Sequence, residues 1–137
     1  MGGVDPEKLF SIFEQADEEI YQEHGLEDLM DNPYVVIGSI VEGMENYYIT
    51  DNIYLFRKAP LYREMREKVK YRYFCKLFSY LNNLDIEDVS KNYYIGESYD
   101  IQESHKALDT LRLYFEDLEE YEKCAVIVKY INLLIKQ

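Results

Sequence analysis

The sequence predicts an all-α protein, an irregular bundle of five or six helices that forms one domain over residues 1–137. Three observations support this prediction. Apolar side chains recur at spacings of three and four residues, the period at which a helix presents one face to a core. The three prolines, Pro6, Pro33 and Pro60, each stand where a helix would begin. Alternation of polar and apolar residues, typical of a half-buried strand, is absent from the most strand-like segment, residues 33–56.

The first helix is expected to begin at Asp5-Pro6-Glu7 and to end at Gly25. Asp5 supplies a side-chain acceptor at the N-cap, proline occupies a position that needs no amide, and Glu7 lies near the positive end of the helix dipole. The residues that form its apolar stripe are Leu9, Phe13, Ala16 and Ile20.

Residues 33–56 leave two alternatives open. Asn32-Pro33 is a second helix start, and one helical face would then hold Tyr34, Ile37, Val41, Met44 and Tyr48. The two glycines and the β-branched run at residues 35–37 would also suit a hairpin, with residues 47–56 as the returning strand. We favour the helix because neither candidate strand alternates in polarity.

Ala59-Pro60 begins a third helix that is expected to reach about Asn82. Its apolar residues cover one side at first and extend nearly all round from Phe74 to Leu81. Residues 69–81 are therefore expected at the centre of the fold. A short helix over residues 85–91 and a connection over residues 92–99 should follow.

The last two helices are expected to form an antiparallel hairpin. Asp100 and Glu103 have the spacing of a capping box, and the apolar pattern that follows continues to Leu118. After a break at residues 118–120, a final stripe is formed by Tyr121, Cys124, Val128, Ile131 and Ile135. Two amphipathic helices joined by so short a break pair with each other.

The net charge of −12 at pH 7, from 27 acidic and 15 basic residues, disfavours general binding to nucleic acid or anionic lipid. The bases are concentrated in residues 57–76, where eight of them accompany two acids. This segment could bind nucleic acid through Arg63, Arg66, Lys70, Arg72 and Lys76. Alternatively, acidic neighbours in the same molecule neutralise it. We favour neutralisation because the field of the whole molecule repels a polyanion.

Tyrosine is unusually frequent, with fifteen residues and no tryptophan. Adjacent helical residues cannot both face the core, so each Tyr-Tyr pair should place at least one ring near the surface, where tyrosine provides contact area for a partner. An acidic run also spans the break between the last two helices. The structural alternatives are that the tyrosine rings cover helix ends with their hydroxyls in water, and that the acidic run is a solvated face. The candidate protein-binding residues are Tyr47, Tyr48, Tyr93, Tyr94, Glu116, Asp117, Glu119 and Glu120.

No catalytic, cofactor or metal site is predicted. His24, Cys75, His105 and Cys124 are scattered without ligand spacing, and neither a Gly-x-Ser-x-Gly motif nor a glycine-rich phosphate loop occurs. Both cysteines stand at apolar helical positions, so we expect buried free thiols.

These features favour a non-enzymatic protein-interaction module, which binds a protein with a basic patch through an acidic, tyrosine-bearing surface. A homodimer is a further option, and an alternative function is mimicry of nucleic acid to inhibit a nucleic-acid-binding protein.

No run of 18 apolar residues and no leader pattern occur, so a cytoplasmic protein without a membrane span is expected. Abundant Phe, Tyr, Ile, Asn and Lys suggest an AT-rich genome, such as that of a phage or another mobile element.

Overall fold

The computed structural model describes residues 10–13, 15, 33–57, 60–84 and 101–135. Within these ranges the helices are α2 (Pro33–Phe56), α3 (Pro60–Asn82), α5 (Ile101–Asp117) and α6 (Tyr121–Ile135). Residues 10–13 and 15 are helical as well. No strand occurs in the described ranges, so the all-α prediction is confirmed and residues 33–56 form a helix instead of a hairpin. The remainder of the helix expected up to Gly25, the short helix over 85–91 and the connection over 92–99 lie outside the described residues.

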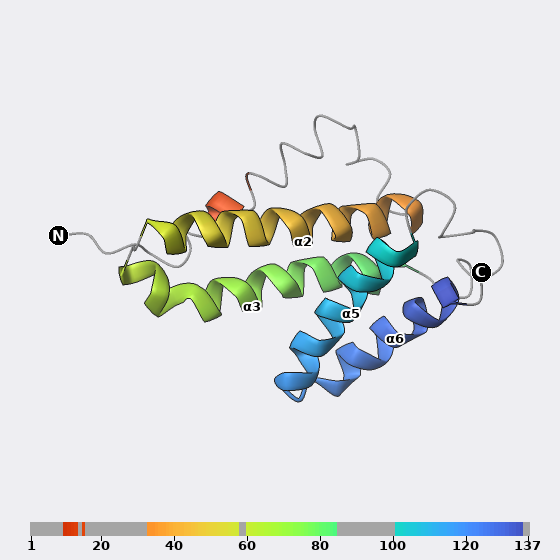
Figure 1. Ribbon diagram of the computed structural model, residues 1–137. Helices are drawn as coiled ribbons and strands as arrows, with labels where there is room; N and C mark the ends of the chain where they lie inside the picture. The colour runs from red at the N-terminus through yellow and green to blue at the C-terminus, as the bar shows by residue number, and fades with distance from the viewer. Residues whose placement is uncertain (1–9, 14, 16–32, 58–59, 85–100, 136–137) are drawn as a thin grey trace.

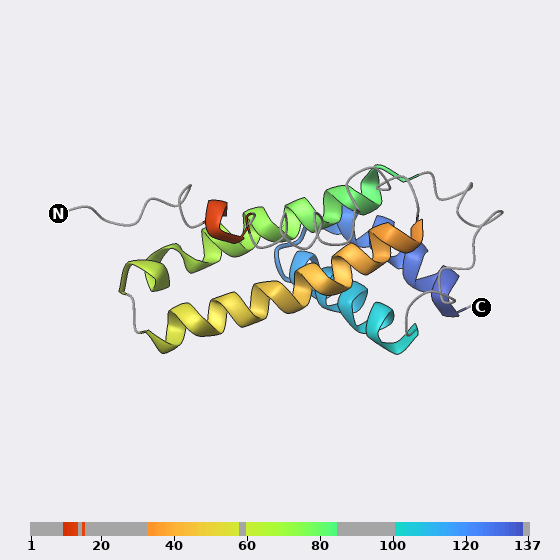
Figure 2. The same ribbon diagram turned by 90° about the horizontal axis from the view of Figure 1, so that it is seen from above.

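The helices form two hairpins that pack against each other. α2 and α3 lie side by side as a long antiparallel hairpin, and α5 and α6 form a shorter one that contacts it (Figure 1). The end at which α2 leads into α3 extends beyond α5 and α6, as is also clear from above (Figure 2). The C-terminal antiparallel hairpin predicted from the sequence is thus confirmed.

The second half of α3 supplies the centre of the core, as its apolar pattern predicted. The buried residues of this half are Val69, Tyr73, Phe74, Leu77, Phe78 and Leu81. α2 approaches α3 closely at Gly43, where a Cβ atom would lie 2.8 Å from Cδ2 of Leu77. The Tyr73 hydroxyl also donates a hydrogen bond to the carbonyl oxygen of Gly43, at 3.1 Å. A glycine therefore allows α2 to pack directly on the central helix.

The buried face of α6 differs from the predicted stripe. Tyr121 and Val128 are exposed and Cys124 is half-buried. Ile131 of the predicted stripe is buried as expected, and the other residues of α6 that enter the core are Ile127, Tyr130 and Leu134. Residues 124–128 are apolar on every side of the helix, so the spacing alone could not distinguish two neighbouring faces.

The turn between α5 and α6 has the hydrogen bonds of a Schellman motif. The amide of Glu120 donates to the carbonyl of Phe115, and the amide of Glu119 donates to the carbonyl of Glu116, both at 2.9 Å. This motif requires a left-handed residue after the helix, and Glu119 adopts it with φ of 61°. Glycine normally occupies this position because a side chain in the left-handed region costs about 1 kcal/mol.

Glu119→Gly is therefore expected to stabilise the protein by about 1 kcal/mol, since it removes this strain without changing the turn. Urea denaturation of both proteins measures the difference in the free energy of unfolding. Glu116→Gly is the matched control, because Glu116 lies within α5 and glycine there should destabilise the helix by about 1 kcal/mol. A loss of stability in Glu119→Gly would contradict the strained turn.

Candidate protein-binding site

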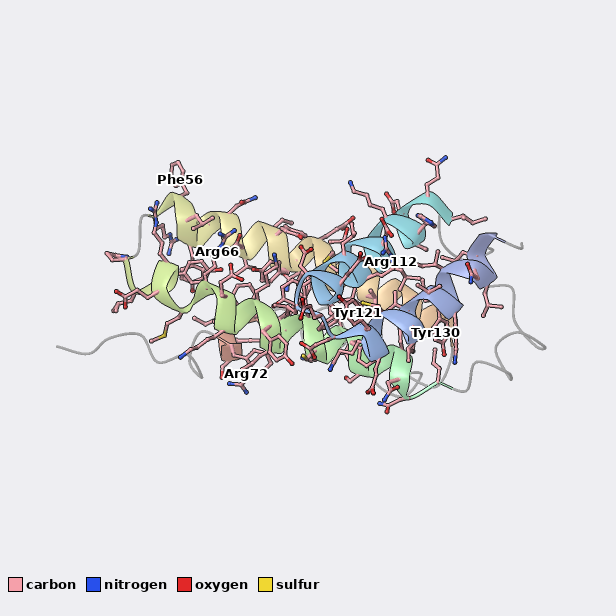
Figure 3. All side chains as sticks on the ribbon, turned by 90° about the horizontal axis from the view of Figure 1, so that it is seen from below. Phe56, Arg66, Arg72, Arg112, Tyr121 and Tyr130 are labelled. Carbon is pink, nitrogen blue, oxygen red and sulfur yellow. The ribbon has the colours of Figure 1, made fainter. Side chains whose placement is uncertain are left out.

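The α5–α6 turn, residues 116–122, gathers acidic and apolar side chains at one surface and is called the acidic turn below. Glu116, Asp117 and Glu119 are exposed there. Tyr121 begins α6 with 62% of its surface exposed (Figure 3), and Leu118 in the turn is exposed as well. Tyr121 was expected in the buried stripe of α6, so its exposure at the surface is a correction. Its position directly after the acidic run was the available signal.

A hollow of about 540 Å³ lies between the acidic turn and the C-terminal end of α3. Phe78 and Asn82 of α3 line one side, and Tyr121 and Val126 of α6 line another. Three glutamates, Glu119, Glu120 and Glu122, and the Lys123 side chain complete the lining. The hollow thus combines apolar surface with a surplus of carboxylates, a combination that suits a side chain with an apolar stem and a cationic head.

The carboxylates of this surface fall into two groups. Glu120 accepts hydrogen bonds from Lys123 at 2.7 Å and from the Tyr71 hydroxyl at 3.1 Å, and the bond from Lys123 is the main reason that the pKa of Glu120 is lowered. Glu116 accepts a hydrogen bond from Arg112 at 2.6 Å. In contrast, the carboxylates of Asp117, Glu119 and Glu122 form no ion pair within the described part of the chain.

The tyrosine pairs do not join this surface. Tyr47 is buried in the core, where its ring stacks on Phe13 with a centroid distance of 5.4 Å, so its assignment as a surface contact is wrong. Tyr48 is exposed, as expected for one ring of the pair, but it lines a separate hollow between α2 and α5 that also includes Lys106. Tyr93 and Tyr94 lie outside the described residues.

Among the candidate nucleic-acid-binding residues, Arg66 is neutralised within the molecule. Its Nε and Nη2 atoms donate to the two oxygens of Asp51 at 2.8 and 2.9 Å, and the Tyr62 hydroxyl donates to the same carboxylate at 2.5 Å. Asp51 has a relative exposure of 2%. Burial raises the pKa of Asp51, but the hydrogen bonds from Arg66 and Tyr62 outweigh this effect and the net pKa is lowered.

The other basic side chains of α3 do not form one free cationic face. The guanidinium of Arg72 lies 4.2 Å from the ring centroid of Phe10, and the Lys70 ammonium lies 5.1 Å from that of Tyr114. Lys76 is half-buried, whereas Arg63 is exposed. Aromatic rings, and not only the expected acidic neighbours, therefore accommodate these cations.

The thiols offer no reactive centre. Cys75 and Cys124 are unpaired and half-buried, so they are less buried than expected. Burial raises the pKa of both thiols, which disfavours the thiolate form at neutral pH. His105 is half-buried in α5, and His24 lies outside the described residues. No group of three His, Cys, Asp or Glu side chains able to hold a metal ion occurs among the residues that the structure describes.

Two broader findings concern the class of protein. In the described part of the chain, every helix is either too short or too polar to cross a bilayer. In comparisons with protein-family models, curated proteins and solved structures, the chain matches none of them.

Proposed function

We propose that this protein is a non-enzymatic interaction module, and that the acidic turn binds a protein partner that carries a basic patch. The observation that carries the proposal is the exposed Tyr121, which lines the hollow together with Glu119 and Glu122. Tyrosine gives a large amphipathic contact area with few rotatable bonds, so it is often an energetic anchor in protein interfaces.

Charge supports the same type of partner. Near the anchor in the sequence, Asp117, Glu119 and Glu122 form no ion pair with another described residue, and the chain as a whole carries −12. Such a surface accelerates the encounter with a basic protein and disfavours acidic competitors. Lys123 already pairs with Glu120 in the neighbouring hollow, and Glu119 and Glu122 are the lining carboxylates that a lysine or arginine of the partner would meet.

Site-specific photo-crosslinking in the source cell tests the proposal. A benzoylphenylalanine at position 121 should capture a protein with a basic surface, whereas the same probe at Lys129, an exposed position farther along α6, should not. With the captured partner purified, Tyr121→Ala should weaken its binding about thirtyfold, as expected for an interface anchor. Tyr48→Ala, at an exposed tyrosine on a different surface, should leave the affinity unchanged.

The affinity should also fall as the salt concentration increases, because the carboxylates of the acidic turn contribute through screened charge. Equal capture from positions 121 and 129, or an unchanged affinity in Tyr121→Ala, would refute the proposal. Competition by DNA for the partner would favour the alternative in which the carboxylates imitate phosphates.

A further inference from the structure

The side of α2 away from α3 carries exposed apolar side chains from Ile49, which with Glu45 also lines the hollow beside α5, to Phe56 at the end that extends beyond α5 and α6. Ile49, Ile53 and Phe56 have exposed fractions of 61%, 46% and 88%, and are called the α2 row below. Asp51 faces the opposite way, toward Arg66 on α3. Since a helix turns by about 100° per residue, Ile49 and Ile53 each lie about 160° from Asp51 around the axis. Figure 3 shows Phe56 pointing away from α3 and Arg66 lying between the two helices.

Opposite charges stand at the two ends of the α2 row. Glu45 is exposed one turn before Ile49, and Arg57 is exposed one turn after Ile53. The arrangement is symmetric, because residue 51 is the midpoint between Ile49 and Ile53 and also between Glu45 and Arg57. A surface with this symmetry is complementary to itself when a second helix lies antiparallel to it.

We propose that a second copy of this chain covers the α2 row, in an antiparallel pair whose twofold axis passes opposite Asp51. Ile49 then meets Ile53 of the second copy, and Glu45 meets Arg57 of the second copy, each contact occurring twice. Phe56 packs over the segment that begins at Glu45 of the second copy. A parallel pair would instead bring Glu45 against Glu45 and Arg57 against Arg57, which like-charge repulsion disfavours.

The length of the α2 row sets the expected affinity of the dimer. From Glu45 to Arg57 the helix rises about 18 Å, so the contact is smaller than a standard protein interface and the dimer is expected to be reversible. Each copy carries −12, which opposes association at long range. At physiological ionic strength the screening length is about 8 Å, and the local pairing of Glu45 with Arg57 then outweighs the distant repulsion.

This contact is separate from the acidic turn. α2 and the tip of the α5–α6 hairpin lie on opposite sides of the molecule (Figure 1). Tyr121→Ala should therefore leave the dimer intact, and failure of the dimer would not affect the proposal for the acidic turn.

Sedimentation equilibrium from micromolar to millimolar concentration tests the dimer. The average mass should rise with concentration from the 16.5 kDa of one chain toward twice that value. Ile49→Glu should remain monomeric throughout, because it places charge in the middle of the apolar contact. Leu113→Glu is the matched control, since Leu113 is an exposed leucine on α5 and its substitution should not change the mass. A wild-type mass of one chain at every concentration, or an unchanged mass in Ile49→Glu, would overturn the proposal.

A charge exchange tests the antiparallel arrangement. Glu45→Arg and Arg57→Glu should each weaken the dimer about tenfold, because each creates two like-charge contacts. The double variant, which combines both substitutions in one chain, should restore the wild-type dissociation constant within about threefold. Additive weakening in the double variant would rule this arrangement out. Thermal melting of all variants establishes that each one is folded.

Discussion

Leu77→Asp is expected to abolish cooperative folding. Leu77 is fully buried at the centre of the core and contacts the site where Gly43 lets α2 approach α3. Removal of a buried leucine side chain costs about 2–5 kcal/mol, and burial of a carboxylate without a partner adds several more. The sum is comparable to the whole stability of a typical domain, about 5–15 kcal/mol.

The measurement is thermal unfolding followed by far-UV circular dichroism. Leu113→Asp introduces the same change at a leucine with 46% exposure and should cost about 1 kcal/mol or less. A cooperative transition in Leu77→Asp at nearly the wild-type temperature would show that α3 is not the central helix.

Arg66→Ala should have the second-largest effect, a loss of about 3 kcal/mol at neutral pH. The substitution leaves Asp51 buried, with the Tyr62 hydroxyl as its one remaining side-chain hydrogen-bond donor among the described residues of the other helices. A buried charge that loses its partner typically destabilises a protein by about 3–5 kcal/mol, and we expect the lower end because the Arg66 side chain is itself 38% exposed. Urea denaturation measures the loss.

The pH dependence of the stability distinguishes loss of this ion pair from loss of the packing contacts that the Arg66 side chain makes. In the wild type the pKa of Asp51 is lowered, so the pair stabilises the fold above about pH 4, and this contribution is lost as the pH falls through the folded-state pKa. Without Arg66, burial should raise that pKa above its unfolded value. The contribution of Asp51 to the variant is then most favourable below about pH 4 and is lost as the pH rises. The stability gap between the two proteins should narrow in acid.

Arg63→Ala is the matched control for this experiment. Arg63 lies one turn earlier on α3 but is exposed, so its removal should change stability by about 0.5 kcal/mol or less at any pH. Asp51→Ala combined with Arg66→Ala should cost less than the sum of the two single substitutions, because the partners are in direct contact. If the difference in stability between the wild type and Arg66→Ala stays constant from neutral pH to acid, the ion pair is contradicted.

The helical framework was predictable because its signals are local. Pro33 and Pro60 begin α2 and α3 as expected, since proline fixes the backbone angle that the first helical residue needs. The dense apolar pattern from Phe74 to Leu81 correctly indicated the centre of the fold, although the buried residues there lie on one face of α3 and Ser79 between them is exposed.

Features that depend on how helices cross were not predictable in the same way. The pairing of Arg66 with Asp51 joins residues on two helices, and the sequence indicated only that acids somewhere would neutralise the basic segment. Likewise, the sequence required one exposed ring in the Tyr47-Tyr48 pair but could not say which. The position of α3 decided this, because Tyr47 packs edge-on against Phe74 at a centroid distance of 5.2 Å.

The candidate surface was predicted in part. The acidic run at residues 116–120 pointed to the α5–α6 turn, but its anchor, Tyr121, fitted a helical stripe equally well. A helix that is apolar on several sides gives no unique inward face, and the packing of α6 against its neighbours buried Ile127 and Tyr130 instead. The exposure of Tyr121 follows from that choice.

The left-handed Glu119 sets the stability of the turn against the binding proposed for its carboxylates. A glycine would satisfy the backbone there without strain, yet it would remove a carboxylate from the rim of the hollow. The trade-off can be read from a single substitution, because the gain in folding free energy and the loss of attraction for a cationic ligand arise from the same side chain. At position 119, glycine would therefore give the more stable fold, and glutamate the stronger attraction for the proposed cationic partner.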